Sequence, residues 1–245
     1  MNVDDLQKLK FDELKKIALG MDIKIPKTKT ELVTIMFDCF REYENYKKEK
    51  IDKYTKIQQL GNKGKEGITY LVKTNDDLKY AMKTFKKNKS SDKLRKEARF
   101  QEIASEYNIS PKIIEIDTVS KYIVMEKLDK HLFDVLKEKN GILSIEQQKQ
   151  VIKIFKILDK CQIFHADCNL MNYMYKNKKL YIIDFGMAKD IDDKLIKKLG
   201  TSTPNLYIST LGFILKLKEF NCPKTSYSYF LEFINDENKI KFNLI

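Results

Sequence analysis

Length, composition and charge exclude several classes of protein. The chain has 245 residues, 42% of them hydrophobic, which suffices for one two-lobed domain and a small additional module. No run approaches the ~20 apolar residues of a membrane span, and the first residues lack the apolar stretch of a signal peptide. We therefore expect no membrane partner. Four cysteines occur without C-x-x-C spacing, so we expect neither a zinc site nor a disulfide framework. This use of cysteine predicts an intracellular protein of the cytoplasm or nucleus.

The excess positive charge belongs to the second part of the chain. The formal net charge is +12, yet residues 1–50 hold eleven bases against ten acids, which leaves 36 bases and 25 acids for the rest. Such an excess favours an acidic or polyanionic partner. Only three of the bases are arginines, so a surface that reads phosphates through paired guanidinium hydrogen bonds is not indicated.

The first 45 residues predict two helices joined by an extended loop. Asp12 is expected to cap a helix that Gly20 ends, and the T-x-x-E pattern from Thr28 to Glu31 predicts a capping box for a second helix. Apolar residues recur at helical spacing in both segments, at positions 14, 17 and 18 and at positions 32, 35 and 36. Residues 46–53, rich in Glu and Lys, read as a linker or a solvated extension of the helix.

This pattern of helix, loop and helix over roughly residues 5–40 resembles a SAP domain, a small module that in other proteins often binds DNA. The resemblance makes residues 1–45 a SAP-like module with DNA as an expected partner. Lys24, Lys27 and Lys29 are the residues that would meet phosphates. The alternative is docking to the rest of the chain or to a protein partner, because the net charge of the segment is only +1.

From Tyr54 onward, alternating apolar residues bounded by turns predict a meander of antiparallel strands up to Met82. Between the first two strands lie Gly61, Gly64 and Gly67. Glycines let a hairpin fold closely over phosphates, with backbone amides facing the oxygens. This loop therefore predicts a nucleotide site.

The next strand and helix supply a candidate ion pair for that site. The frame Y-A-M-K places Ala81 and Lys83 on a strand, and Lys83 is expected to reach phosphate oxygens. Such a lysine needs a carboxylate to hold it. In the predicted helix 91–107 we choose Glu97, with Glu102 as the second choice.

The segment K-Y-I-V-M-E-K-L predicts a buried strand that leads into a hinge. Met125 is expected to guard an adenine pocket, and the backbone of Glu126 to Leu128 is expected to pair with the base. Met174 and Ile183 are expected to close the pocket floor. Two predicted helices, 132–136 and 145–158, then begin a second lobe.

The most informative motifs are H-A-D-C-N-L-M-N, from His165, and I-I-D-F-G, which ends at residue 186. Five residues separate Asp167 from Asn172, and twelve more lead to Asp184. Phosphoryl transfer uses one carboxylate to orient the attacking hydroxyl, while a carboxylate and an amide oxygen hold Mg²⁺ ions. We interpret His165 as a structural support of the loop, because nothing else forms a metal set with it.

With these motifs in order, residues 54 to about 220 resemble the eukaryotic-type protein kinase superfamily. The resemblance implies an α+β, two-lobed fold for residues 54–245, with an antiparallel sheet in the N-lobe (54–125) and a shortened helical C-lobe (129–245). It also implies ATP and Mg²⁺ as cofactors, with phosphate transferred to Ser or Thr of a protein substrate. Asp167 would then be catalytic, Asn172 and Asp184 would hold the metal, and Lys83 with Glu97 would anchor the phosphates.

Three departures from the family pattern leave alternatives open. Ala166 stands in place of the arginine of H-R-D, Asn169 in place of the catalytic-loop lysine, and no A-P-E motif or following aspartate is visible. The short C-lobe resembles compact atypical kinases of the RIO and KEOPS-associated types, or kinase-like proteins of large DNA viruses, which adds an infected host cell as a setting. The alternatives are a pseudokinase scaffold and a small-molecule kinase of the aminoglycoside or choline type, against which Phe185 and Gly186 argue.

Overall fold

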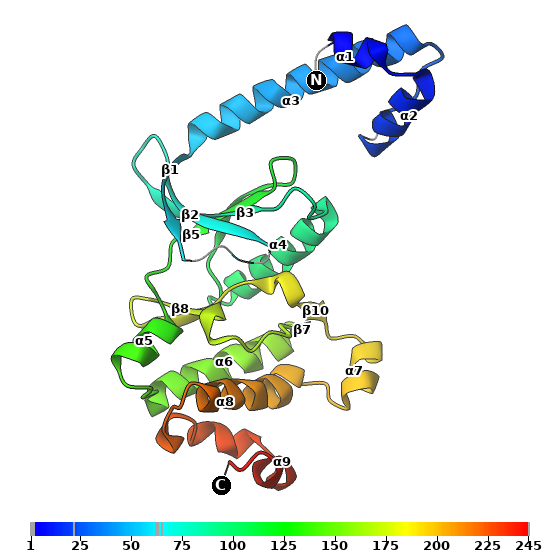
Figure 1. The fold of residues 1–245 in the computed structure, drawn as a ribbon. Coiled ribbons are helices and arrows are strands. Elements are labelled where there is room, and N and C mark those ends of the chain that lie inside the picture. The colour runs from blue at the N-terminus through cyan, green and yellow to red at the C-terminus, as the bar shows by residue number, and fades with distance from the viewer. Residues whose placement is uncertain (1–2, 22, 62–63, 65, 245) are drawn as a thin grey trace. The chain divides into compact units, whose positions relative to one another are not determined.

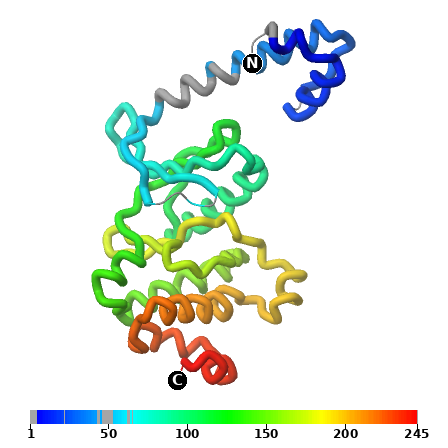
Figure 2. Tube along the Cα trace, viewed as in Figure 1, coloured from blue at the N-terminus to red at the C-terminus, as the bar shows by residue number. Residues whose placement is uncertain are grey.

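The computed structural model describes residues 3–21, 23–61, 64 and 66–244. Contacts divide the chain into two compact units. The first is Met1–Thr55 with Lys73–Leu78, and the second is Lys56–Val72 with Lys79–Ile245. Figure 1 labels their elements, and the colours of Figure 2 follow the chain from one end to the other.

In its described residues the first unit contains three helices, α1 (Val3–Lys8), α2 (Phe11–Gly20) and α3 (Lys29–Lys53). α1 was not predicted. α3 runs through residues 46–53, so of the two interpretations of this segment the extension of the helix is correct and the separate linker is not. The three helices share a small apolar core of their own, made of Leu6, Leu14, Ala18, Leu32, Val33 and Met36.

The helix starts of this unit test two predictions. The capping box of α3 is confirmed, because the Glu31 backbone N–H donates to Thr28 Oγ1 (3.2 Å) and the Thr28 N–H donates to the Glu31 carboxylate (3.3 Å). The predicted cap Asp12 was wrong. α2 begins at Phe11, two residues before the start that a cap at Asp12 implies, and the Glu13 carboxylate accepts the Lys10 N–H (2.8 Å), which leaves Asp12 inside the first turn.

The second unit begins with a five-stranded sheet whose strands are ordered β1-β2-β3-β5-β4. The strands are β1 (Thr55–Leu60), β2 (Gly67–Lys73), β3 (Lys79–Phe85), β4 (Ile113–Asp117) and β5 (Tyr122–Glu126). β3 and β5 pair antiparallel, with Ala81 opposite Met125 and Lys83 opposite Ile123. This register places three predicted site residues, Ala81, Lys83 and Met125, on adjacent strands.

α4 (Ser91–Glu106) crosses beside this sheet and presents a mixed face to it. Ser90 caps the helix, because its hydroxyl accepts the Lys93 N–H (3.3 Å). Leu94 and Ala98 join the sheet core, while Glu97 is buried on the same helix. A buried carboxylate is costly unless it is paired, so its position already points to a cationic partner.

A helical lobe follows the sheet, as Figure 1 shows below it. Its main helices are α5 (Leu132–Glu138), α6 (Ile145–Lys160), α7 (Asp193–Leu199), α8 (Thr210–Glu219) and α9 (Asp236–Lys241). Its short strands are β6 (Lys130–His131), β7 (Ile163–Phe164), β8 (Tyr173–Lys176), β9 (Lys179–Ile182) and β10 (Lys189–Asp190). Single turns of 3-10 helix at Leu170–Asn172 and Phe185–Met187 carry the two polar motifs.

Aromatic rings hold the core of this lobe together. Phe213 of α8 packs edge-on against Tyr173 (5.0 Å between ring centroids), Phe230 (5.4 Å) and Phe155 (6.3 Å). All four rings are fully buried. Edge-to-face contacts of this kind add about 0.5–1.5 kcal/mol each to the burial itself. α8 is therefore firmly seated beneath the loop that contains Asp167.

The predicted α+β class, with an antiparallel sheet followed by a helical lobe, is confirmed. The two predicted helices at 91–107 and 145–158 correspond to α4 and α6. Within the described ranges, no helix combines the length and apolar character needed to cross a bilayer. The SAP-like nature of the first unit stays a prediction.

Candidate active site

Lys83 lies between two carboxylates. Its Nζ is 2.6 Å from Glu97 Oε1 and 2.8 Å from Asp184 Oδ1. The burial of Lys83 by itself would lower its pKa, but the charges of Glu97 and Asp184 outweigh this effect and the pKa is raised. Strand β3, helix α4 and the end of β9 thus meet at one ammonium group, which is the contact that the choice of Glu97 anticipates.

A second lysine, missed by the sequence analysis, completes this cluster. Lys89 is 7% exposed in its side chain, and its Nζ contacts both Glu97 Oε2 and Glu66 Oε2, the latter at 2.6 Å. Oxygens of Glu66, Glu97 and Asp184 lie within 4.8 Å of one another. Three carboxylates therefore share two ammonium groups, and Glu66 ties the glycine-rich loop to α4.

Asp184 has the backbone conformation of a tight turn. Its φ of +66° lies in the left-handed region, and its carboxylate accepts the Gly186 N–H (3.4 Å). Partial burial would raise the pKa of Asp184, but the charge of Lys83 and its hydrogen bond outweigh this and lower the pKa. The carboxylate is therefore ionised at neutral pH and able to hold a cation.

His165 connects the two polar motifs from below. Its ring nitrogens are 3.1 Å from the carbonyl oxygens of Asp167 and Ile183, and its ring packs edge-on against Phe185. The backbone of Ala166 between them is left-handed, with φ +62°. Burial lowers the pKa of His165, although the hydrogen bonds to the two carbonyl oxygens act in the opposite direction. These contacts agree with a structural role for His165 and hold the Asp167 loop beside the strand end before Asp184.

Asn172 fits a role as a hard oxygen ligand. Its backbone carbonyl accepts the Ile183 N–H (2.9 Å), which fixes it next to the Asp184 strand, while its buried Nδ2 has no hydrogen-bond partner in the described part of the chain. Carboxylate and carboxamide oxygens suit Mg²⁺. Asn172 and Asp184 would hold such an ion, whose charge would neutralise phosphate oxygens. Asp167 Oδ1 accepts the Asn169 N–H (3.0 Å), which orients the carboxylate from its own loop.

The sequence analysis also missed a buried, hydrogen-bonded pair below this loop, Asp159 and Asn205. Asn205 Oδ1 accepts the His165 N–H (3.1 Å), and Asn205 Nδ2 donates to Asp159 Oδ1 (2.7 Å) and to the Ile163 carbonyl (2.7 Å). The Asp159 carboxylate also accepts the N–H groups of Asn205 and Leu206, both at 2.9 Å. Burial raises the pKa of Asp159, against these hydrogen bonds. The pair fixes the start of the segment leading into α8 to the backbone at Ile163 and His165, just before Asp167.

The glycine-rich loop is only partly described. Gly61 has a φ of +67°, and the Gly64 N–H donates to the Gly67 carbonyl (2.9 Å). Gly67 is pressed against β3, because a Cβ on it would lie 2.1 Å from the Thr84 carbonyl oxygen. Side chains other than glycine are thus excluded at this position, which brings the two strands close together beneath the loop.

The residues predicted to surround adenine lie on two different sheets or next to them. Ala81 and Met125 are buried opposite each other on β3 and β5. Glu126 cannot offer its N–H to a base, since that group donates to the Lys112 carbonyl (2.9 Å). The other three are Leu128, which is buried, and Met174 and Ile183, which are half-buried on or next to the β8–β9 hairpin.

Comparison with known proteins gives the family. Residues 54–208 match the family model described as protein kinase domain. The chain is 28% identical over 133 residues to "KEOPS complex subunit Bud32" of Pyrococcus abyssi, covering 52% of this chain and 59% of that protein. It is 26% identical over 229 residues to "Putative serine/threonine-protein kinase L268" of Acanthamoeba polyphaga mimivirus, covering 84% of this chain and 41% of that protein. The chain thus spans less than two thirds of either relative.

The family match covers more than half of the chain and contains the polar motifs described above, so this chain belongs to the protein kinase domain family.

Proposed function

We propose that the chain is a protein kinase that transfers the γ-phosphate of ATP to serine or threonine hydroxyls of proteins, with Mg²⁺ as the metal. The proposal is carried by the meeting of Lys83, Glu97 and Asp184, because these residues come from three separate elements. A purely structural role would not explain why Lys83 lies between two carboxylates. It would also not explain why the side-chain amide of Asn172 has no hydrogen-bond partner in the described part of the chain.

The residues would divide the work as follows. Lys83, held by Glu97, binds phosphate oxygens, and Asp184 with Asn172 holds the metal, which neutralises charge that develops on the phosphates. Asp167 orients the acceptor hydroxyl and receives its proton. The charge of Lys83 lowers the pKa of Asp184, so the carboxylate that would hold the metal is ionised while it contacts Lys83.

The test is transfer of labelled phosphate from ATP to a panel of acidic and basic proteins. Asp184→Ala and Asp167→Asn should each lower the rate by at least about a hundredfold. Equal labelling by wild type and Asp184→Ala would contradict the proposal. Small-molecule acceptors are assayed in parallel, and a preference for them would favour the aminoglycoside or choline type of kinase instead.

A scaffold without catalysis is the second candidate, and Ala166 and Asn169 are the observations that favour it. Both replace charged residues of the usual catalytic loop. Thermal stabilisation by ATP that requires Mg²⁺, with no turnover on any acceptor, would support this candidate. Loss of that stabilisation in Asp184→Ala would still assign the nucleotide site to these residues.

For the first unit we propose DNA binding through the loop before α3. Lys24 and Lys27 are exposed there, whereas Lys29 donates to the Gln7 carbonyl (2.7 Å) and is engaged within its own module. Binding of duplex DNA should weaken steeply with salt if Lys24 and Lys27 contact phosphates. Binding that is unchanged in Lys24→Glu/Lys27→Glu would rule out this surface.

A further inference from the structure

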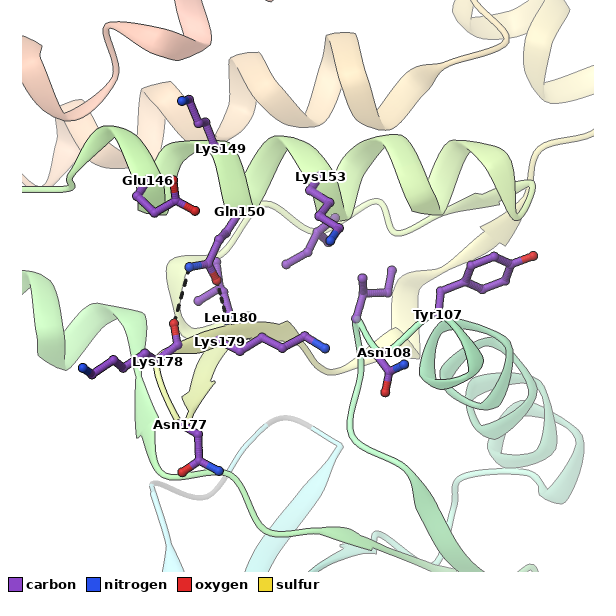
Figure 3. Close-up of a pocket in the computed structure, with 12 residues that line it drawn as sticks. Tyr107, Asn108, Glu146, Lys149, Gln150, Lys153, Asn177, Lys178, Lys179 and Leu180 are labelled. Carbon is purple, nitrogen blue, oxygen red and sulfur yellow. Dashed lines mark hydrogen bonds between the residues drawn. The ribbon is translucent and has the colours of Figure 1, made fainter.

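A pocket of about 410 Å³ lies on the helical lobe, between the loop that follows α4, helix α6 and the β8–β9 hairpin (Figure 3). Its floor contains the aliphatic side chains of Ile109, Ile154 and Leu180. Gln150 of α6 fixes the hairpin to the helix, because its Oε1 accepts the Leu180 N–H (2.7 Å). The walls are therefore rigid, and none of the assigned catalytic or nucleotide residues lines the pocket.

Two lysines from different elements face each other across this pocket. Figure 3 shows the side chains of Lys153 on α6 and Lys179 on β9 converging on the same space near the carboxamide of Asn108. The Nζ of Lys179 lies over the ring of Tyr181 (4.9 Å), and neither lysine forms an ion pair with a carboxylate among the described residues. Partial burial, and then the charge of Lys153, lower the pKa of Lys179. Two cations that repel each other stay together here without a counter-ion from the chain.

The acids near the pocket do not neutralise it. Glu146 also lines the pocket, but it precedes Lys153 by two turns of α6, about 10 Å along the axis. Glu126 is within electrostatic range of Lys179, yet its carboxylate already binds Lys176 Nζ (3.2 Å) and the Lys112 N–H (3.1 Å). The net charge of the pocket is therefore positive.

The shape and chemistry favour a peptide over a nucleic acid. An aliphatic floor and a confined volume suit a side chain of a peptide, whereas a nucleic-acid backbone needs a continuous row of cations. Of the lysines on α6 only Lys149 and Lys153 line the pocket, and the Nζ of Lys149 lies over the ring of Tyr229 (6.0 Å), so the enclosed space is too small for such a row.

We propose that this pocket binds an acidic peptide segment of a protein partner, with carboxylates on Lys153 and Lys179 and an aliphatic side chain on the floor. Substrate proteins of the proposed kinase are natural candidates for such a partner. The binding itself does not depend on catalysis, so Asp184→Ala should bind the peptide as wild type does. Failure of the pocket and failure of the proposed activity are thereby distinguishable.

The experiment measures binding of a fluorescent peptide that alternates glutamate and leucine to the full chain. Lys153→Glu/Lys179→Glu should weaken binding at least about tenfold, because two attractions become repulsions. Lys194→Glu/Lys198→Glu, on the exposed face of α7, is the matched control with the same change in charge and should alter binding less than about twofold. Lys153→Gln/Lys179→Gln should give an intermediate loss, and circular dichroism checks that each variant is folded.

Three results would overturn the proposal. The first is equal weakening by the pocket variant and the α7 control, which would mean attraction by net charge alone. The second is equal affinity for a peptide with glutamine in place of glutamate. The third is a single-stranded oligonucleotide of the same charge that binds more tightly than the peptide and loses affinity in the pocket variant.

Discussion

At the residue scale, the buried pair Asp159 and Asn205 joins the segment before α8 to the backbone at Ile163 and His165. Asn205→Asp would place two carboxylates side by side in the core and should cost roughly 2–4 kcal/mol of unfolding free energy. The exchange Asp159→Asn/Asn205→Asp keeps one carboxylate and one carboxamide in contact, so it should recover part of that loss. Urea unfolding measures the stability of both variants. A double variant no more stable than Asn205→Asp would contradict a stabilising contact between residues 159 and 205.

Lys216 is expected to influence which acceptors are used. Gly212 lies against the catalytic loop, since a Cβ on it would be 2.6 Å from Cys168 Sγ, and Lys216 follows one turn later on the same face of α8. The hydrogen bond and charge of Glu219, and then the charge of Asp167, raise the pKa of Lys216. Lys216→Glu should lower kcat/KM about tenfold for peptides with an acid beside the acceptor, relative to neutral peptides. An equal effect on both peptide classes would contradict a role in specificity.

The lowered pKa of His165 predicts a pH dependence of stability. Its pKa in the folded chain lies below the unfolded value of about 6.5, so the unfolded chain binds the extra proton as pH falls. Stability should therefore decrease from about pH 7.5 to about pH 5.5, by at most ~1.4 kcal/mol per pH unit from this group. In His165→Asn this part of the slope disappears. Urea unfolding at several pH values checks it, and identical slopes would contradict the assignment.

At the element scale, the close approach of β2 and β3 depends on one glycine. Gly67→Ala should cost roughly 1–3 kcal/mol, because its Cβ would lie 2.1 Å from the Thr84 carbonyl oxygen and the strands would have to move apart. Gly64→Ala is the matched control, since the nearest atom to its Cβ is 3.4 Å away. Thermal unfolding compares the two, and equal losses would show that the strand contact is not the cause.

Structural elements were predictable where the residues of a short sequence motif also interact with each other or lie on one strand. The T-x-x-E signal at Thr28 and the A-x-K frame at Lys83 describe interactions between near neighbours or along one strand, and the structure contains both the capping box and the strand. α1 was missed because its six residues carry too little apolar periodicity. The Asp12 cap failed because the helix begins at Phe11, where the carboxylate of Glu13, the next residue after Asp12, accepts the Lys10 N–H.

The missed parts of the site are interactions between elements distant in sequence. Lys89 bonds to Glu66 at a separation of 23 residues, and Asn205 bonds to Asp159 at a separation of 46. In a chain with 47 basic residues, one more lysine carries no signal of its own. Lys89 differs from the neighbouring lysines only in the folded structure, where it is 8% exposed. A buried ammonium group is stable only when it is paired, and the two carboxylates provide this pairing.

At the scale of the whole molecule, the two units have separate apolar cores. Leu32 is fully buried within the helices of the first unit, and Leu158 is fully buried in the helical lobe of the second. Leu→Ala at either site should cost about 2–5 kcal/mol. Because the cores share no residue, we expect each loss to stay within its own unit and the chain to unfold in more than one step.

Hydrogen exchange with mass spectrometry tests this independence. Leu32→Ala should accelerate exchange in α2 and in the part of α3 around Met36 while leaving Val124 of β5 protected, since β5 belongs to the other unit. Leu158→Ala is the matched control and should do the reverse. If Leu32→Ala accelerates exchange in β5 as much as in α2, the units are coupled energetically, and a ligand of the first unit could then alter the kinase domain through stability alone.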